Sequence, residues 1–343
     1  MILNFLANII SLFIGVIFTL IYGNIKTDKT EYKHKDGLSW FFLITKFTWK
    51  FLKSPGEGVI NIDDNLVYVA EPGNADFPLI ISPRNHKITV KNIRLDGEHI
   101  NKYKTLCGYN IHDAIPICYA ELLFTKPLIA LVTSIKFCVS PIGLIHLRQT
   151  IKQFCCLDNI DTDITAVVQV KQYRENDRGV EIDILTQLHN YQQNCIWEGT
   201  TTLFSRKKSV PRKKNIKKQD EDYMFQEEVM VPGNCGVKYA RLSDDWNPHH
   251  LYRWTSWFVG FSKPIAHGMW TLSKALSVIL QKSGDQLDEK HEVICEFKRP
   301  LLMPSKIYIK YEDPNTAFYK QCKIKVEDVK TGVPHLVGTL KHL

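Results

Sequence analysis

The sequence predicts an α+β protein in which one helix-and-sheet unit occurs twice. The second half shows the unit most clearly, because residues 264–281 carry apolar side chains at the spacing of a helix. Four strand-like runs follow, at 293–297, 306–312, 319–326 and 336–342. The first half repeats this order of one apolar helix and then several strands. A chain of 343 residues with 44% hydrophobic residues is long enough for two such units, each with a buried core.

In the first half, an apolar helix is predicted over residues 116–132. Strands are then predicted at 143–147, 164–173, 179–191 and 195–204. The tetrapeptide from Asn176 to Gly179 has the composition of a hairpin turn, so the strands on either side of it should pair antiparallel.

An apolar run from Ile2 to Tyr22 precedes both units and matches the roughly 20 residues that a membrane-spanning helix needs. Lysines follow it at positions 26, 29, 33 and 35, and no Lys or Arg precedes it. By the positive-inside rule, the rest of the chain would lie on the cytoplasmic side of the membrane. A helix docked on the protein's own surface is the alternative. We therefore expect a membrane-anchor helix at residues 1–24 and a lead-in segment at residues 25–84.

A basic connector separates the two halves, since eight of the thirteen residues at 206–218 are Lys or Arg. Like charges repel one another and keep such a segment extended. Contact with anionic lipid is a second interpretation. The connector lacks the interleaved aromatic residues typical of nucleic-acid binding, so no nucleic-acid partner is expected. The predicted units are thus residues 85–205 and 223–343, with a linker at 206–222.

Charge and cysteine content narrow the class of protein. The net charge of +8 suits an anionic ligand or a membrane surface. The nine cysteines are odd in number and scattered, with no C-x-x-C pair, so a disulfide framework or a structural zinc site is not expected. A reducing compartment is the simplest setting. Nothing in the sequence implies a metal or a redox cofactor.

The chemistry is concentrated in the segment 245–250, which reads DWNPHH. Asp245 and His250 lie five residues apart across an Asn-Pro turn and can hold a water between an acid and a base. Asn247 can orient the water or the loop by hydrogen bonding. Gly268 lies near the start of an apolar helix, where unpaired N–H groups favour negative charge, so its N–H is a candidate oxyanion donor. An isolated Asp-x-Asn-Pro would more commonly be a simple turn.

This region resembles the signature of the (R)-specific enoyl-CoA hydratases, the MaoC-like dehydratases. The matching positions are Tyr239, Leu242, Ser243, Asp245, Asn247, Pro248, His250, Ser256, Gly260, Phe261, Pro264, Ile265, His267 and Gly268. Two positions depart from it: Asp244 stands where the family usually has Gly, and His249 where it usually has Ile, Leu or Val. The first half is similar to the family at 103–109, 115–119 and 141–147, but it has no D-x-N-P-x-H.

The resemblance implies a double hot-dog fold, in which two antiparallel sheets each wrap around a long central helix as an intramolecular pseudo-dimer. It also implies that the first unit is degenerate and widens the tunnel for the acyl chain. The protein could then act as a monomeric pseudo-dimer or as a homo-oligomer. The single D-x-N-P-x-H places the active site in the second unit.

The function implied is reversible hydration of trans-2-enoyl thioesters, or dehydration of (3R)-3-hydroxyacyl thioesters, by Asp245 and His250 acting on water. The carrier would be coenzyme A or acyl-carrier protein. Lys298 and Arg299 are candidates to meet the phosphates of coenzyme A, and Trp257 and Phe261 are candidates to contact the acyl group.

Two alternatives stay open at this point, a hot-dog thioesterase and a non-catalytic acyl-thioester-binding protein. The non-catalytic alternative is supported by Asp244 and His249, the two positions that depart from the family pattern. His267 is expected to fix the loop before Gly268. The tryptophans at 246, 254, 257 and 270 are expected either to line an acyl pocket or to pack in the core.

Overall fold

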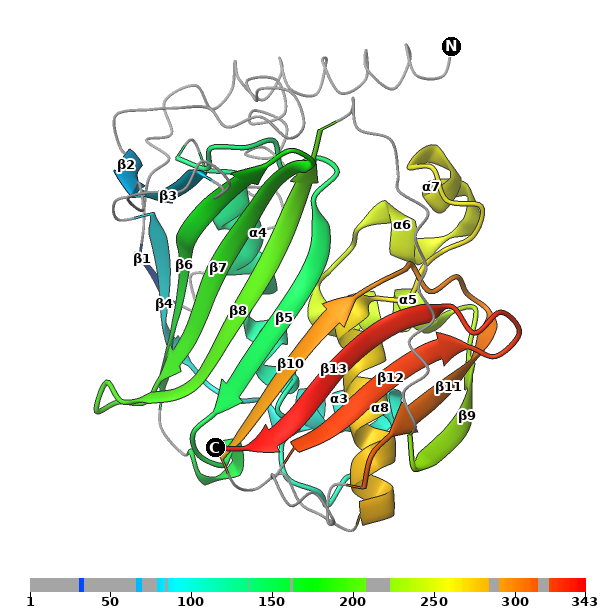
Figure 1. The fold of residues 1–343 in the computed structure, drawn as a ribbon. Helices are drawn as coiled ribbons and strands as arrows, with labels where there is room; N and C mark the ends of the chain where they lie inside the picture. The colour runs from blue at the N-terminus through cyan, green and yellow to red at the C-terminus, as the bar shows by residue number, and fades with distance from the viewer. Residues whose placement is uncertain are drawn as a thin grey trace.

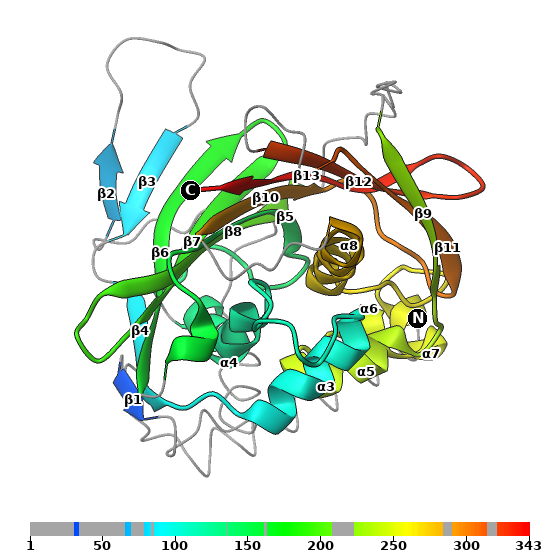
Figure 2. The ribbon, with the colours of Figure 1, turned by 90° about the horizontal axis from the view of Figure 1, so that it is seen from below.

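In the computed structural model, ten strands form two five-stranded units that join edge to edge in one sheet. The residues described are 31–33, 66–69, 79–83, 86–134, 136–160, 163–207, 223–283, 290–313 and 321–343. The sheet curves around the helices, which lie on its concave side (Figures 1 and 2). This arrangement is the double hot-dog that the resemblance implies.

The first unit has the strand order β4-β6-β7-β8-β5. Its strands are β4 (Lys87–Ile93), β5 (Ile145–Gln153), β6 (Ile164–Asn176), β7 (Gly179–His189) and β8 (Cys195–Arg206). The strands predicted at 164–173, 179–191 and 195–204 are confirmed, whereas the strand predicted at 143–147 begins at Ile145 and runs on to Gln153. The hairpin is also confirmed, because Asn176 pairs with Gly179 between β6 and β7. The Asn176 side chain accepts hydrogen bonds from the backbone N–H groups of Arg178 (2.9 Å) and Gly179 (3.1 Å), which stabilises the turn.

The second unit has the mirrored order β10-β13-β12-β11-β9. Its strands are β9 (Phe225–Val231), β10 (His291–Phe297), β11 (Ser305–Tyr311), β12 (Gln321–Asp328) and β13 (Pro334–His342). The units meet where β5 pairs antiparallel with β10, from His291 opposite Gln153 to Glu296 opposite Arg148. Because the edge strand of one unit bonds to the edge strand of the other, neither edge stays open to other chains.

In each unit, the first strand is followed by a short helix and then by a central helix that lies under the sheet. The first unit has α3 (Gly97–Cys107), a 3-10 helix η2 (Tyr119–Phe124) and α4 (Thr125–Val132). The second has α5 (Cys235–Ser243), α6 (Pro248–Leu251), α7 (Arg253–Phe258) and the long α8 (Gly268–Ser283).

The helix predicted at 116–132 is therefore divided between η2 and α4. Pro127 lies in the first turn of α4. Because proline has no N–H, it cannot bond to the carbonyl four residues earlier, so a continuous α-helix through residue 123 is disfavoured.

The cores lie between the central helices and the concave face of the sheet. On α8, Leu272, Leu276 and Ile279 are fully buried, which follows the helical spacing of the apolar residues. Along β7, side chains alternate between the two faces of the sheet, and Ile182 and Ile184 on the core face are fully buried. Burying an apolar side chain of this size contributes roughly 1.5–3 kcal/mol.

The lead-in segment contributes strands that the sequence analysis did not anticipate. β1 (Glu31–Lys33) pairs parallel with β4, and β3 (Leu79–Pro83) pairs antiparallel with β6 and with β2 (Leu66–Val69). These strands extend the outer edge of the first unit. The predicted anchor helix at 1–24 and nearly all of the basic linker lie outside the described residues. Among the helices that the structure describes, none is long and apolar enough to cross a membrane.

Candidate active site

The end of α5 sets the position of Asp245. The helix ends at Ser243, and Asp244 then adopts the left-handed conformation with φ 58°, a position where glycine is usual. An aspartate tolerates this conformation better than most side chains, at a cost of about 1–2 kcal/mol. The carboxylate of Asp244 lies 2.8 Å from the Lys126 ammonium of α4 in the other unit. The departure from the family pattern at Asp244 thus keeps the turn that a glycine would make.

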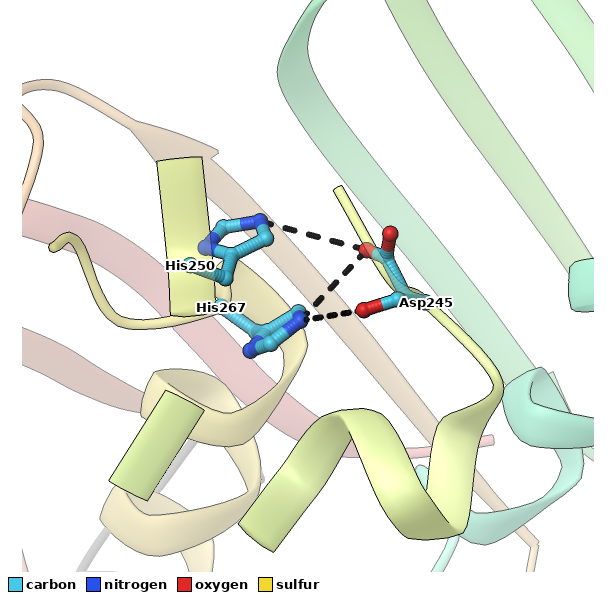
Figure 3. A group of neighbouring side chains, drawn as sticks. All are labelled: Asp245, His250 and His267. Carbon is cyan, nitrogen blue, oxygen red and sulfur yellow. Dashed lines mark hydrogen bonds and ion pairs between the residues drawn. The ribbon is translucent and has the colours of Figure 1, made fainter. Parts of the chain in front are cut away.

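Hydrogen bonds hold one oxygen of the Asp245 carboxylate and leave the other facing two histidines (Figure 3). Asp245 Oδ1 accepts from Asn247 Nδ2 (2.7 Å) and from the Asn247 backbone N–H (3.3 Å). The Asp245 N–H donates to Ser243 Oγ at 3.2 Å. Oδ2 lies 3.9 Å from His250 Nε2 and 3.7 Å from His267 Nε2. Asn247 therefore orients the carboxylate that the sequence analysis paired with His250.

His250 is buried on α6 in a defined tautomer. Its Nδ1 lies 2.8 Å from the carbonyl oxygen of Ile265, which can only accept a hydrogen bond, so Nδ1 carries the proton. Nε2 therefore presents a lone pair toward Asp245. Burial, helped by the neighbouring His267, lowers the pKa of His250 well below that of an ordinary histidine. The ring is neutral at physiological pH and can accept a proton at Nε2.

His267 completes the cluster from the start of α8. Its ring stacks on that of His250, with centroids 3.6 Å apart. Its Nε2 lies 3.1 Å from the Asp245 carbonyl oxygen, so this nitrogen donates and fixes the backbone of Asp245. Burial lowers the pKa of His267 to about 3. The sequence analysis assigned His267 to the loop before Gly268, whereas the structure also brings it against the Asp245 carboxylate.

The spacing of these groups suits a shared water. Asp245 Oδ2 and His250 Nε2 are too far apart to bond directly at 3.9 Å, and near enough for one water to bond to both. Asp245, His250 and His267 each also offer one possible metal-ligand atom, and these three atoms lie within 4.8 Å of one another. A metal, however, would need the lone pair of His267 Nε2, and the bond to the Asp245 carbonyl requires a proton there. The hydrogen-bond pattern therefore favours water over a metal.

Gly268 begins α8 beside the cluster. A Cβ at this position would lie 2.8 Å from the ring of Phe297, so any other residue would require that ring to shift. Within the described residues, its N–H donates no hydrogen bond. Together with the positive end of the helix dipole, this leaves a donor for a developing oxyanion.

His249, the second departure from the family pattern, packs beside the cluster. Its ring lies 4.1 Å from that of His250 and 6.0 Å from that of Phe261. Burial lowers its pKa. These contacts pack His249 against His250 and place Phe261 next to the site.

The other predicted substrate contacts are exposed at the surface. Lys298 and Arg299 directly follow Phe297; Lys298 forms an ion pair with Glu296, and Arg299 is exposed. Trp257 is 68% exposed on α7, and of the four tryptophans considered only Trp270 is buried, at 3%. Contacts of these residues with substrate stay predictions.

The first unit brings a second polar cluster to this region, which the sequence analysis missed. His146 of β5 packs on Phe297 with ring centroids 4.6 Å apart, and the charge of Asp245 acts on its pKa. Gln149 accepts from His146 Nε2 and from Thr201 Oγ1, each at 2.9 Å, and donates to Glu121 of η2. Burial lowers the pKa of His146 to about 4 and raises that of Glu121 to about 8. The only sequence signal was a lone glutamate within the apolar run 116–132.

Comparison with known proteins finds a family model that matches the region of this site. Residues 214–336 match the family model described as MaoC like domain. The 3-hydroxyacyl-thioester dehydratase X of Mycobacterium tuberculosis is 23% identical over 266 residues, which cover 76% of this chain and 90% of that protein. The crystal structure of HtdX of Mycobacterium tuberculosis has a TM-score of 0.61 at 21% identity and covers 75% of this chain and 100% of its own.

A MaoC-like dehydratase from Phytophthora capsici has a TM-score of 0.59 at 16% identity and covers 75% of this chain and 95% of its own. At these identities, the two structural likenesses support the fold.

Proposed function

We propose that the protein is a hydro-lyase that interconverts 3-hydroxyacyl and trans-2-enoyl thioesters, because residues 214–336 match the family model described as MaoC like domain. The dehydratase relative from Mycobacterium tuberculosis supports the reaction class. One observation supports the site best: Asp245 Oδ2 and His250 Nε2 face each other at 3.9 Å, and each group's other heteroatom is already hydrogen-bonded.

In hydration, the water would donate one hydrogen to Asp245 Oδ2 and the other to His250 Nε2. Both atoms are acceptors, because His250 carries its proton on Nδ1. The lone pairs of the water are then directed at C3 of the enoyl thioester. The side chain of Asp245 is 31% exposed, so solvent and substrate can reach it.

As the oxygen attacks C3, one O–H bond of the water breaks and its proton passes to the pair. The pair returns a proton to C2, and negative charge collects meanwhile on the thioester oxygen. The Gly268 N–H is placed to stabilise that charge. We treat Asp245 and His250 as one coupled acid–base unit, since interacting groups share their titration. Dehydration is the same sequence in reverse.

The direct test is to incubate purified protein with crotonyl-CoA and with longer trans-2-enoyl-CoAs while following the loss of enoyl absorbance. Hydration without release of free thiol is the expected result. Release of thiol without hydration would favour a thioesterase, and binding without turnover would favour a non-catalytic acyl-thioester-binding protein.

We also propose that residues 1–24 anchor the protein to a membrane with both units on the cytoplasmic side. The proposal rests on the apolar run from Ile2 to Tyr22 and on the lysines that follow it. Deleting residues 1–24 should move the protein from the membrane fraction to the soluble fraction and leave hydratase activity in place. An unchanged membrane fraction would contradict the anchor.

A further inference from the structure

Exposed aromatic side chains cover α7, the short helix that follows the active-site histidine. We define the α7 aromatic surface by five residues: Tyr252, Trp254, Trp257, Phe258 and Val259. Their exposed fractions are 50%, 64%, 68%, 53% and 46%. In Figures 1 and 2, α7 lies at the rim of the fold. The tryptophans expected in a pocket or in the core thus largely face solvent.

These side chains form one continuous surface. The rings of Tyr252 and Trp254 stack with centroids 6.3 Å apart, Trp254 meets Phe258 at 6.3 Å, and Trp257 meets Phe258 at 5.5 Å. Single exposed apolar residues are common on proteins, but contiguous patches usually mark an interaction surface. Tryptophan and tyrosine are the residues enriched where proteins meet the headgroup region of a bilayer.

The fold holds this surface firmly against the site. Thr255 Oγ1 accepts from the Tyr252 N–H at 3.0 Å and donates to the carbonyl oxygen of Pro248 at 2.7 Å, which links α7 to α6. Ser256 is fully buried on the opposite face of α7. The aromatic side chains face outward because the inner face of the helix is already packed.

The charged side chains in the segment that carries the surface are all positive. The sequence contains no Asp or Glu between Asp245 and Asp285. Arg253 and Lys263 are exposed beside the aromatic residues, and neither has an ion-pair partner in the described part of the chain. Such cations are attracted to the anionic headgroups of a membrane. The apolar run from Ile2 to Tyr22, with lysines after it, points to the same partner independently.

We propose that the α7 aromatic surface docks on an anionic lipid bilayer. Because α6 and α7 are consecutive, docking would hold His250 close to the membrane surface, where long acyl chains partition. The proposal does not depend on the proposed reaction, and residues 252–259 lie far from the N-terminal apolar run in the sequence.

Hydrogen exchange of the full-length protein, followed by mass spectrometry, tests the proposal locally. With vesicles of phosphatidylcholine and phosphatidylserine, the exchange rate of the amides of residues 252–261 should fall by about fivefold or more, because docking suppresses local opening. Vesicles of phosphatidylcholine alone should give a smaller effect. Hydration of crotonyl-CoA, a short soluble substrate, should not change, so failure of this proposal is distinguishable from failure of the reaction.

The variants Trp257→Glu and Trp254→Ala/Trp257→Ala should lose this slowing, even if the N-terminal run still binds the vesicles. The control variant Tyr191→Ala removes an aromatic residue that is 65% exposed on the β7–β8 loop. This variant should still show slower exchange at residues 252–261 with the mixed vesicles. If the mixed vesicles leave exchange at residues 252–261 unchanged, the proposal is overturned. A protein partner or the chain's own apolar run would then be the occupant of the surface. Equal slowing with both kinds of vesicle overturns the anionic preference.

Discussion

The two units share a scaffold and differ in the connection between their helices. In each unit, the helix after the first strand ends in a residue of left-handed conformation, Gly108 after α3 and Asp244 after α5. Residues 108–118 then lead to η2 in the first unit, whereas residues 244–267 lead to α8 in the second. The longer connection carries Asp245, His250 and the α7 aromatic surface. The sheet and central helix thus form a frame that occurs both with and without the proposed catalytic groups.

Polar groups in the two connections also serve different purposes. At the position that corresponds to His267, the first unit has Tyr119, as the Pro-Ile pairs just before both residues indicate. Tyr119 Oη donates to His99 Nδ1 at 3.0 Å, and His99 Nε2 donates to the carbonyl oxygen of Leu242 at 3.0 Å. This chain of bonds ties the first unit to α5. In the second unit, acceptor atoms instead face each other across a space that suits a water.

The largest effect should come from Asp245 and His250, the proposed catalytic pair. Asp245→Asn and His250→Ala should each lower the rate of hydration by about 10²–10⁴-fold, because positioned acid–base groups contribute this much. The fold should persist, as circular dichroism would check. Asp113→Asn alters the corresponding connection of the first unit and should leave turnover unchanged. Full activity in either catalytic variant would sink the assignment.

Asn247→Ala should have the next largest effect, since it removes the 2.7 Å side-chain bond to Asp245 Oδ1 and leaves only the longer bond from the backbone N–H. A hydrogen bond to a charged group contributes about 1.5–3 kcal/mol, so kcat should fall about 10- to 100-fold. Steady-state kinetics would measure it. The matched change is Asn110→Ala, because Asn110 Oδ1 accepts only from the nearby His112 N–H in the first unit. Equal losses in both variants would mean a general effect on folding.

Stability should depend on pH in opposite directions through the two units. Glu121 has a pKa of about 8 in the fold against an ordinary value of 4.5, so the folded state binds its proton more tightly. Its contribution to stability is lost as pH rises through about 8. His267 has a pKa of about 3 against 6.5, so the unfolded state binds that proton more tightly. Its contribution is present above about pH 6.5 and lost as pH falls toward 3.

Urea unfolding between pH 4 and 9 would separate the two contributions. Glu121→Gln should flatten the alkaline side of the profile, and His267→Gln should flatten the acid side. A profile unchanged in both variants would contradict these protonation states.

The smallest effect is expected for Asp244→Gly, which gives α5 the residue that α3 already has at Gly108. Relief of the left-handed conformation should contribute about 1–2 kcal/mol, and loss of the exposed ion pair with Lys126 should cost about 0.2–1 kcal/mol. The free energy of unfolding should therefore change little, and kcat should stay within about twofold. A large loss of activity would show that Asp244 positions the pair in some further way.

Much of the local structure could be predicted from the sequence. Helical spacing located α8, alternation and composition located the later strands of both units, and Asn176 to Gly179 marked the hairpin. The spacing of Asp245, Asn247 and His250 indicated the pair and its orienting amide. These features depend on neighbours in the chain, which a local pattern encodes directly.

Only the tertiary structure decided which distant groups meet. The pairing of β5 with β10, the strands of the lead-in segment, His267 against Asp245 and His146 beside Phe297 all join residues far apart in the sequence. Apolar spacing shows that a face is buried but not what it is buried against. Tryptophan shows this limit clearly, because Trp270 lies in the core while Trp254 and Trp257 face solvent. Their shared chemistry is set by the sequence, and their different partners are set by the packing of α7 and α8.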